Sequence, residues 1–89
     1  MAERELTVLN KMGLHARPAA EFVRCVRTFK STILIRKDGD EFSASSILDV
    51  LMANLDCGST LILSADGPDA ELALEKLSAL LHEFKLQEG

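Results

Sequence analysis

The chain has 89 residues, 47% of them hydrophobic, and a formal net charge of −4. This acidic balance argues against nucleic-acid binding as the main task, because neutralising phosphates needs a basic surface. The longest apolar run, Val50–Ala53, is far too short to span a bilayer, and no apolar signal region opens the chain, so we expect a cytoplasmic protein without direct membrane insertion.

The first third of the chain predicts a strand, a loop and a helix. Leu6 and Val8 alternate with polar residues, which predicts a strand over Arg4–Leu9. A helix is expected over Ala16–Phe29, where Pro18 suits the first turn because its missing N–H costs nothing there. The apolar stripe of this helix, expected to face the core, consists of Ala19, Phe22, Val23 and Val26.

The middle of the chain predicts a hairpin and a second, short helix. β-branched and apolar residues indicate a strand over Thr32–Lys37, and the return strand covers Asp40–Ser43. The dipeptide Asp38-Gly39 between them is a strong hairpin signal, since both residues tolerate positive φ. The short helix is expected over Ser46–Ala53.

A fourth strand over Thr60–Ala65 and a last helix over Asp69–Lys85 are predicted next. The apolar face of the last helix comprises Ala73, Leu77, Leu80, Leu81 and Phe84. The order strand, helix, strand, strand, helix, strand, helix favours an α+β fold, with an antiparallel sheet and helices packed on one face. A chain of this length is expected to form a single domain, residues 1–89.

The segment GLHARPAA, residues 13–20, carries the candidate functional residues. Gly13 lets the incoming backbone turn sharply, and His15 falls where the helix begins. A helix start exposes unpaired N–H groups, here those of Ala16 and Arg17, and the positive end of the helix dipole, which together favour an anion. That anion could be bonded to the ring itself, because a neutral imidazole nitrogen both accepts and surrenders a phosphoryl group readily.

Arg17 adds a planar fork of donors that can reach phosphate oxygens and offset charge during transfer. The plainer alternative is that His15 caps the helix and Arg17 is a solvated charge. Arg17, Ala20, Arg24 and Arg27 share one helix face and form a basic stripe. This basic stripe is either a solvated face or a surface that docks acidic partners, for which charge matching speeds encounter more than it deepens affinity.

The remaining chemistry-bearing residues indicate no second site. Cys25 and Cys57 lie far apart and outside any metal-ligand spacing, so we expect buried or partly buried free thiols, as suits a reducing cytosol. His82, near the end of the last helix, is expected to be structural or simply exposed. No metal and no cofactor are predicted, and a metal- or ligand-binding domain is the weakest of the functional hypotheses.

The segment around His15 resembles the active-site sequence of HPr, the histidine phosphocarrier family of the bacterial sugar phosphotransferase system. The resemblance extends through Ser45–Leu48, Cys57–Leu61 and Ala65–Pro68, in one register over nearly all 89 residues. It implies an HPr-like open-faced sandwich, β-α-β-β-α-β-α, in which three helices cover one face of a four-stranded antiparallel sheet. It also implies a monomer.

The resemblance implies a function as well. In this family enzyme I, charged by phosphoenolpyruvate, phosphorylates the histidine that matches His15, on its Nδ1 atom. The group then passes to a histidine of an enzyme IIA domain for sugar uptake. Such a protein is a stoichiometric carrier rather than an enzyme, and the residue that matches Arg17 stabilises the phosphoryl group in transit.

The second helix is expected to divide its apolar residues between the core and a docking patch. Ile47, Val50 and Leu51 are assigned to the core, whereas Leu48 and Met52, four residues apart, fall on a different face. By the resemblance, that face docks against partners together with the basic stripe.

Ser46 admits two interpretations. It suits the N-cap of the second helix in an S-x-x-acid pattern with Asp49, a variant of the capping box. It also matches the serine that HPr kinase/phosphorylase modifies in related proteins, so the alternative function is a regulatory binding module of the nitrogen-type or catabolite-control kind. Asp49, Ser45 and Met12 depart from the family pattern, where glycine, lysine, and serine or asparagine are usual, and Asp49 would repel a phosphate on Ser46.

Overall fold

The computed structural model describes residues 1–88, and the elements follow the predicted order. They are β1 (Ala2–Thr7), α1 (Ala16–Val26), β2 (Thr32–Lys37), β3 (Asp40–Ser43), α2 (Ile47–Met52), β4 (Thr60–Asp66) and α3 (Ala70–Gln87). The four strands form one antiparallel sheet in the order β1-β4-β2-β3. The structure thus has the α+β fold, β-α-β-β-α-β-α, that the sequence predicts.

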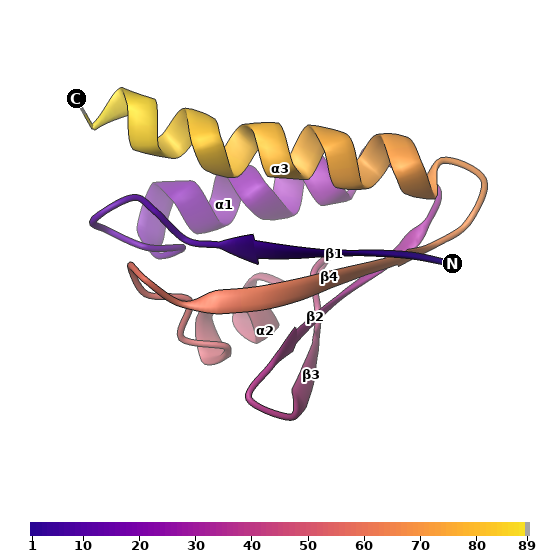
Figure 1. Cartoon of the computed structure of the whole chain (residues 1–89), viewed down its shortest axis with the longest axis horizontal. Coiled ribbons are helices and arrows are strands. Elements are labelled where there is room, and N and C mark those ends of the chain that lie inside the picture. Colours follow the sequence, from indigo (N-terminus) through magenta and orange to yellow (C-terminus); the bar gives the residue numbers. More distant parts are fainter. Residues whose placement is uncertain (89) are drawn as a thin grey trace.

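The helices pack on the sheet and on one another. α1 and α3 lie side by side along the sheet, and the shorter α2 packs against α1 and near β3 (Figure 1). The hairpin of β2 and β3 turns at Asp38 and Gly39, whose φ angles of 53° and 84° are both positive, as predicted. β4 lies between β1 and β2, and its alternate residues Leu61, Leu63 and Ala65 point into the core.

The core lies between the sheet and the helices. The predicted inner residues that are buried are Ala19, Phe22, Val23 and Val26 of α1 and Ala73, Leu77, Leu81 and Phe84 of α3. Leu80 is only partly buried, and Leu74 is buried without having been predicted, because the inner stripe of α3 follows positions 70, 73, 74, 77, 81 and 84. On the β1 side, Val8 is buried and Leu6 packs partly against the same core.

The first strand begins and ends two residues earlier than predicted. β1 covers Ala2–Thr7 rather than Arg4–Leu9, because its pairing with β4 extends over just these six residues. Beyond β1, the backbone of Val8 bonds to the loop before β4 instead. Its N–H donates to the carbonyl of Ser59 at 2.8 Å, and its carbonyl accepts from the N–H of Gly58 at 2.8 Å.

The first helix ends at Val26, three residues before the predicted end. The N–H groups of Thr28 and Phe29 donate to carbonyls only three residues back, at 3.0 and 3.2 Å, which tightens the last turn. The hydroxyl of Thr28 also donates to the carbonyl of Cys25 at 2.6 Å, and such side-chain bonds compete with a continuing helix. The boundaries of the other elements agree with the prediction to within two residues.

Both cysteines are free, as predicted. Cys25 is partly buried, and burial raises the pKa of its thiol more than the nearby Lys76 ammonium lowers it. Cys57 was predicted to be at least partly buried, but it is exposed, so that prediction is wrong. It lies in the turn before β4, where its only hydrogen bond among the described residues is a weak one to the carbonyl of Leu9, at 3.7 Å.

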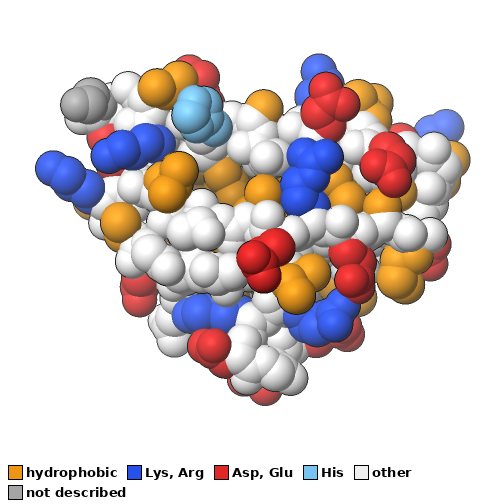
Figure 2. Space-filling model, in the orientation of Figure 1, with side chains coloured by type: hydrophobic (Ala, Val, Ile, Leu, Met, Phe, Trp, Pro, Cys, Tyr) orange, Lys and Arg blue, Asp and Glu red, His pale blue; other side chains and the backbone are white. Residues whose placement is uncertain are grey.

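The surface carries both signs of charge. Figure 2 shows Lys, Arg, Asp and Glu side chains interspersed with apolar ones on one face of the molecule. On that face the two signs of charge are mixed rather than separated. Within residues 1–88, none of the helices combines the length and the apolar character that crossing a membrane requires.

Candidate functional site

The loop from β1 to α1 is held in place by close backbone contacts. Gly13 has a φ of 66°, and a Cβ on it would lie 2.5 Å from the carbonyl oxygen of Leu55. A glycine is therefore needed for the loop to approach the segment before β4 so closely. At this contact the N–H of Leu14 donates to the carbonyl of Leu55 at 2.8 Å, and the buried side-chain amide of Asn10 donates to the carbonyl of Gly13 at 2.9 Å.

The end of α3 contacts the same loop. The side chain of Glu88 accepts from the N–H of Lys11 at 2.6 Å and from the N–H of Met12 at 3.1 Å. The bond from Lys11, followed by the bond from Met12 and the charge of Lys85, lowers the pKa of Glu88. No sequence motif signals this contact, because it joins residues 76 or more positions apart.

His15 lies at the N-cap of α1 in an extended conformation, with φ −126° and ψ 161°. Its ring makes no capping hydrogen bond, so the side chain of His15 does not cap the helix. Instead, Nε2 donates to Oδ1 of Asp56 at 2.7 Å, and 37% of the His15 side chain is exposed. Because a carboxylate only accepts, the neutral ring carries its proton on Nε2 and keeps a lone pair on Nδ1.

Asp56 is a candidate site residue that sequence patterns did not indicate. It lies 41 positions from His15, so no local motif joins the two. The available signal is topological: β1 pairs antiparallel with β4, and Thr7 lies opposite Thr60. This pairing brings the loop after β1 and the loop before β4 to the same end of the sheet.

The helix start beside His15 is open to an anion. Ala16 and Arg17 are exposed, and the first turn of α1 contains no acidic residue to oppose the positive end of the helix dipole. Ala16 has a φ of 51°, a left-handed value that costs a residue with a Cβ about 1–3 kcal/mol. The guanidinium of Arg17 forms no ion pair within residues 1–88, which leaves it available to an added anion.

The basic stripe borders a hollow between α1 and α2. This hollow, of about 290 Å³, is lined by Ala20, Val23, Arg24, Arg27 and Ile47. Arg27 is more than a solvated charge, since its Nε donates to the carbonyl of Ser45 at 3.0 Å and ties α1 to the loop before α2. The structure thus brings Ala20, Arg24 and Arg27 together around one concave surface.

α2 exposes more apolar surface than predicted. Leu48 and Met52 are 69% and 67% exposed, in agreement with the expected outer face. Ile47 and Leu51 were assigned to the core, but they are 36% and 37% exposed, so that assignment is wrong. Of the three residues assigned to the core, only Val50 is buried, because a helix of six residues presents few positions to the interior.

Ser46 occupies the N-cap of α2, as predicted. Its Oγ accepts from the N–H of Asp49 at 3.3 Å. The capping box is only half formed, because the carboxylate of Asp49 accepts from the N–H of Ser43 at 2.9 Å and not from Ser46. The N-cap interpretation of Ser46 is therefore confirmed, whereas the second hydrogen bond of a capping box, from the Ser46 N–H to the Asp49 carboxylate, does not form.

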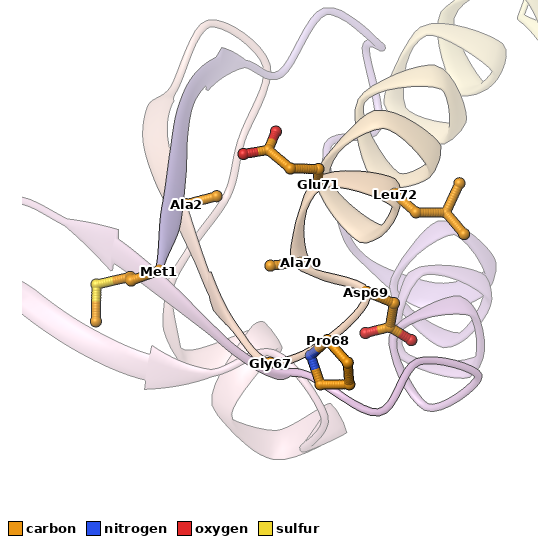
Figure 3. A pocket seen from close by; sticks show the side chains of 8 residues that line it. All are labelled: Met1, Ala2, Gly67, Pro68, Asp69, Ala70, Glu71 and Leu72. Atoms are coloured by element: carbon orange, nitrogen blue, oxygen red, sulfur yellow. The ribbon is translucent and has the colours of Figure 1, made fainter.

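A hollow larger than the one between α1 and α2 lies away from His15. It measures about 540 Å³, and Figure 3 shows that its lining comes from the beginning of the chain at β1, the turn between β4 and α3, and the start of α3. Asp69 and Glu71 are the only charged side chains in this lining, and the carboxylate of Asp69 already accepts hydrogen bonds from Lys30 and Ser31. His82, which lies elsewhere on α3, was predicted to be either structural or simply exposed, and it is exposed. In the described part of the chain, no three His, Cys, Asp or Glu residues are grouped to hold a metal.

Fold and site together define a small α+β protein that presents a partly exposed imidazole at the start of a helix. Residues 2–83 match the model of the PTS HPr component phosphorylation site. The chain belongs to this HPr family, whose members include the phosphocarrier proteins of the phosphotransferase system.

Relatives match over most of their length. The phosphocarrier protein HPr of Cupriavidus necator is 38% identical over 81 residues, 91% of each chain. The HPr-like protein Crh of Halalkalibacterium halodurans is 40% identical over 83 residues, 93% of this chain and 99% of the other. A crystal structure of HPr from Thermoanaerobacter tengcongensis aligns with a TM-score of 0.92, at 38% identity and 94% coverage of both chains. An HPr dimer from that organism aligns with a TM-score of 0.75, also at 38% identity, over 93% of this chain and 95% of the other.

Proposed function

We propose that this protein is a phosphoryl carrier that accepts a phosphoryl group on His15 from phosphorylated enzyme I. It then passes the group to a histidine of an enzyme IIA domain for sugar uptake. The observation that carries the proposal is the partly exposed imidazole of His15 at the start of α1, beside the N–H groups of Ala16 and Arg17. Membership of the HPr family supports the same role.

Transfer onto His15 requires one exchange of bonds. The lone pair of Nδ1 attacks the phosphorus, the bond between phosphorus and the donor atom of enzyme I breaks, and its electron pair stays on the donor. No proton has to leave Nδ1, because the neutral ring carries its proton on Nε2. The guanidinium of Arg17 binds the phosphoryl oxygens as charge spreads over them, and the N–H groups of Ala16 and Arg17 face the product anion.

We assign partner docking to the basic stripe and to Leu48 and Met52 of α2. Ala20, Arg24 and Arg27 line the hollow beside α2, and the two apolar side chains are exposed. The arginines complement an acidic partner surface, and the apolar side chains lose contact with water when a partner covers them. A carrier that serves two partners in turn needs such an interface to form and dissociate rapidly.

The carrier is regenerated in each cycle, so it is a stoichiometric component of the system rather than an enzyme, and it needs no metal or cofactor. It works in the cytoplasm as a monomer, with residues 1–89 forming one domain. Because an HPr dimer is among the matched structures, the mass in solution checks the oligomeric state directly. Sedimentation should give one species of 9.7 kDa.

The match to the HPr-like protein Crh favours a second candidate function. In it, the protein is a regulatory module that acts by docking to partners, and HPr kinase/phosphorylase modifies Ser46. Ser46 is partly exposed at the N-cap of α2, within reach of a modifying protein. The backbone N–H of Asp49 donates to Ser46 Oγ, so the carboxylate of Asp49 lies nearby. Its negative charge opposes a phosphate on Ser46.

Mass spectrometry after incubation with phosphoenolpyruvate and enzyme I tests the first candidate. The carrier function predicts a mass increase of one phosphoryl group, which acid removes because a P–N bond is acid-labile. His15→Ala should show no increase. The C. necator HPr serves as the control for active enzyme I, and an unchanged mass beside a phosphorylated control overturns the proposal. The regulatory candidate predicts an acid-stable phosphate, added by the kinase, that survives His15→Ala and is lost in Ser46→Ala.

A further inference from the structure

We propose that Asp56 is a positioning residue for His15. Its carboxylate holds the imidazole in the tautomer with the proton on Nε2, so that Nδ1 is the nitrogen that reacts. This inference rests on the proposed function and adds the residue that selects the reacting atom. The contact that carries it joins Nε2 of His15 to Oδ1 of Asp56 at 2.7 Å.

The fold itself brings the two residues together. Leu14, directly before His15, and Leu55, directly before Asp56, are both fully buried. The N–H of Leu14 donates to the carbonyl of Leu55 at 2.8 Å. This hydrogen bond between the preceding residues holds the backbones of His15 and Asp56 close together. Gly13 permits this approach, since a Cβ on it would lie 2.9 Å from the Cα of Asp56.

The turn that carries Asp56 is fixed as well. The N–H of Asp56 donates to the carbonyl of Asn54 at 2.9 Å, and its carbonyl accepts from the N–H of Ser59 at 2.9 Å. Both backbone groups of Asp56 are thus occupied. Within residues 1–88 the carboxylate accepts a hydrogen bond from His15 alone, so its contact with the ring competes with no other role.

A carboxylate at Nε2 acts on the ring in two ways. It accepts hydrogen bonds only, so the neutral ring keeps its proton on Nε2 and presents the lone pair at Nδ1. When Nδ1 attacks phosphorus, the ring gains positive charge, which the negative charge beside Nε2 stabilises. A carboxylate that orients an imidazole from behind has the same task in Ser-His-Asp triads.

The exposure of Asp56 fits positioning better than stabilisation of the fold. Its side chain is 69% exposed, and a side-chain contact so close to water contributes little to the free energy of folding. The same water screens its repulsion of an incoming phosphoryl group, which approaches the other ring nitrogen. The contact therefore costs the transfer reaction little while it fixes the tautomer.

Asp56→Ala tests the inference, with Asp66→Ala as the matched control. Asp66 is an exposed aspartate at the opposite end of β4, and its loss changes the net charge equally. Nitrogen NMR of the neutral ring reports the tautomer. Phosphoramidate, a small phosphoryl donor with no docking surface, reports the rate of attack independently of partner binding. We expect the wild type and the control to keep an unprotonated Nδ1, and Asp56→Ala to show mixed tautomers and phosphorylation slowed about tenfold.

Either half of this result can overturn the inference. An unchanged tautomer in Asp56→Ala shows that the carboxylate does not select the nitrogen. An unchanged rate despite mixed tautomers shows that the selection has no effect on transfer. Failure of the wild type to accept a phosphoryl group from enzyme I overturns the proposed function instead, and it leaves the tautomer measurement intact, so the two failures are distinguishable.

Discussion

At the scale of single residues, the candidate site divides its tasks between two side chains around one ring. Asp56 binds Nε2 of His15 at 2.7 Å and leaves Nδ1 with its lone pair. Arg17, which forms no ion pair in the described chain, is available to the oxygens of the transferred group. In the mechanism that we propose, the aspartate orients the nucleophile, and the arginine offsets the charge on the phosphoryl group during transfer.

Replacing Arg17 with alanine should lower the rate of transfer from saturating enzyme I about 10- to 100-fold, because the phosphoryl oxygens lose charged donors during transfer. The free energy of unfolding should change by less than about 0.5 kcal/mol, since the side chain is exposed. Rapid-quench kinetics measures the first quantity and urea denaturation the second. Arg4→Ala, an exposed arginine of β1, is the control, and equal rates in the two variants would remove Arg17 from the mechanism.

Sequence patterns located His15 and Arg17 because both belong to one short segment at a predicted helix start. They did not indicate Asp56 or Glu88. Those side chains reach the loop before α1 through the pairing of β1 with β4 and through the end of α3, from at least 41 positions away in the chain. Contacts of this kind depend on the three-dimensional arrangement, and single-sequence patterns do not encode them.

At the scale of elements, the predictions were most accurate for features that depend on residues adjacent in the chain. Asp38-Gly39 sets the turn of its hairpin through its own backbone preferences, and both strands beside it were placed correctly. α1 ended early because Thr28 bonds to the preceding turn. Ile47 and Leu51 were misassigned because the packing of α2 against α1 and near β3, not its periodicity, determines which side chains are covered.

The docking role that we propose for α1 predicts a salt-dependent encounter with partners. The exposed arginines of the basic stripe attract an acidic partner over a distance that falls from about 10 Å at 0.1 M salt to about 3 Å at 1 M. The second-order rate of phosphorylation by enzyme I should therefore fall about tenfold over that range. Arg24→Gln should flatten the salt dependence, whereas Lys76→Gln on α3 should keep it. A wild-type rate that is indifferent to salt would show that the stripe takes no part in docking.

At the scale of the whole molecule, carboxylates tie both ends of α3 to other elements. At its start, Asp69 accepts from the N–H of Lys30 at 2.8 Å and from the N–H and hydroxyl of Ser31 at 3.0 and 2.5 Å. The hydroxyl of Ser31, followed by the N–H of Lys30, lowers the pKa of Asp69. At its end, Glu88 binds the loop before α1 and has a lowered pKa for the same kind of reason.

These lowered pKa values predict a loss of stability in acid. A carboxyl whose pKa is lower in the folded state stabilises the fold above its ordinary pKa, here 3.8 for Asp69 and 4.5 for Glu88, and loses that contribution as pH falls through the folded value. The free energy of unfolding should therefore fall as the pH decreases from about 5 to about 3. Urea denaturation at a series of pH values measures it. Asp69→Asn should weaken the dependence and Asp38→Asn, in the exposed hairpin turn, should keep it; identical curves in both variants would contradict the assignment.

Whether His15 can be both loaded and emptied is tested most directly by phosphorus NMR on one sample. The protein is first incubated with phosphoenolpyruvate and enzyme I, then separated and mixed with an active enzyme IIA. We predict a single phosphohistidine signal, from Nδ1, that appears in the first step, disappears in the second, and never forms in His15→Ala. A sample that gains no such signal, or one whose signal persists beside active enzyme IIA, would contradict a carrier function for this chain.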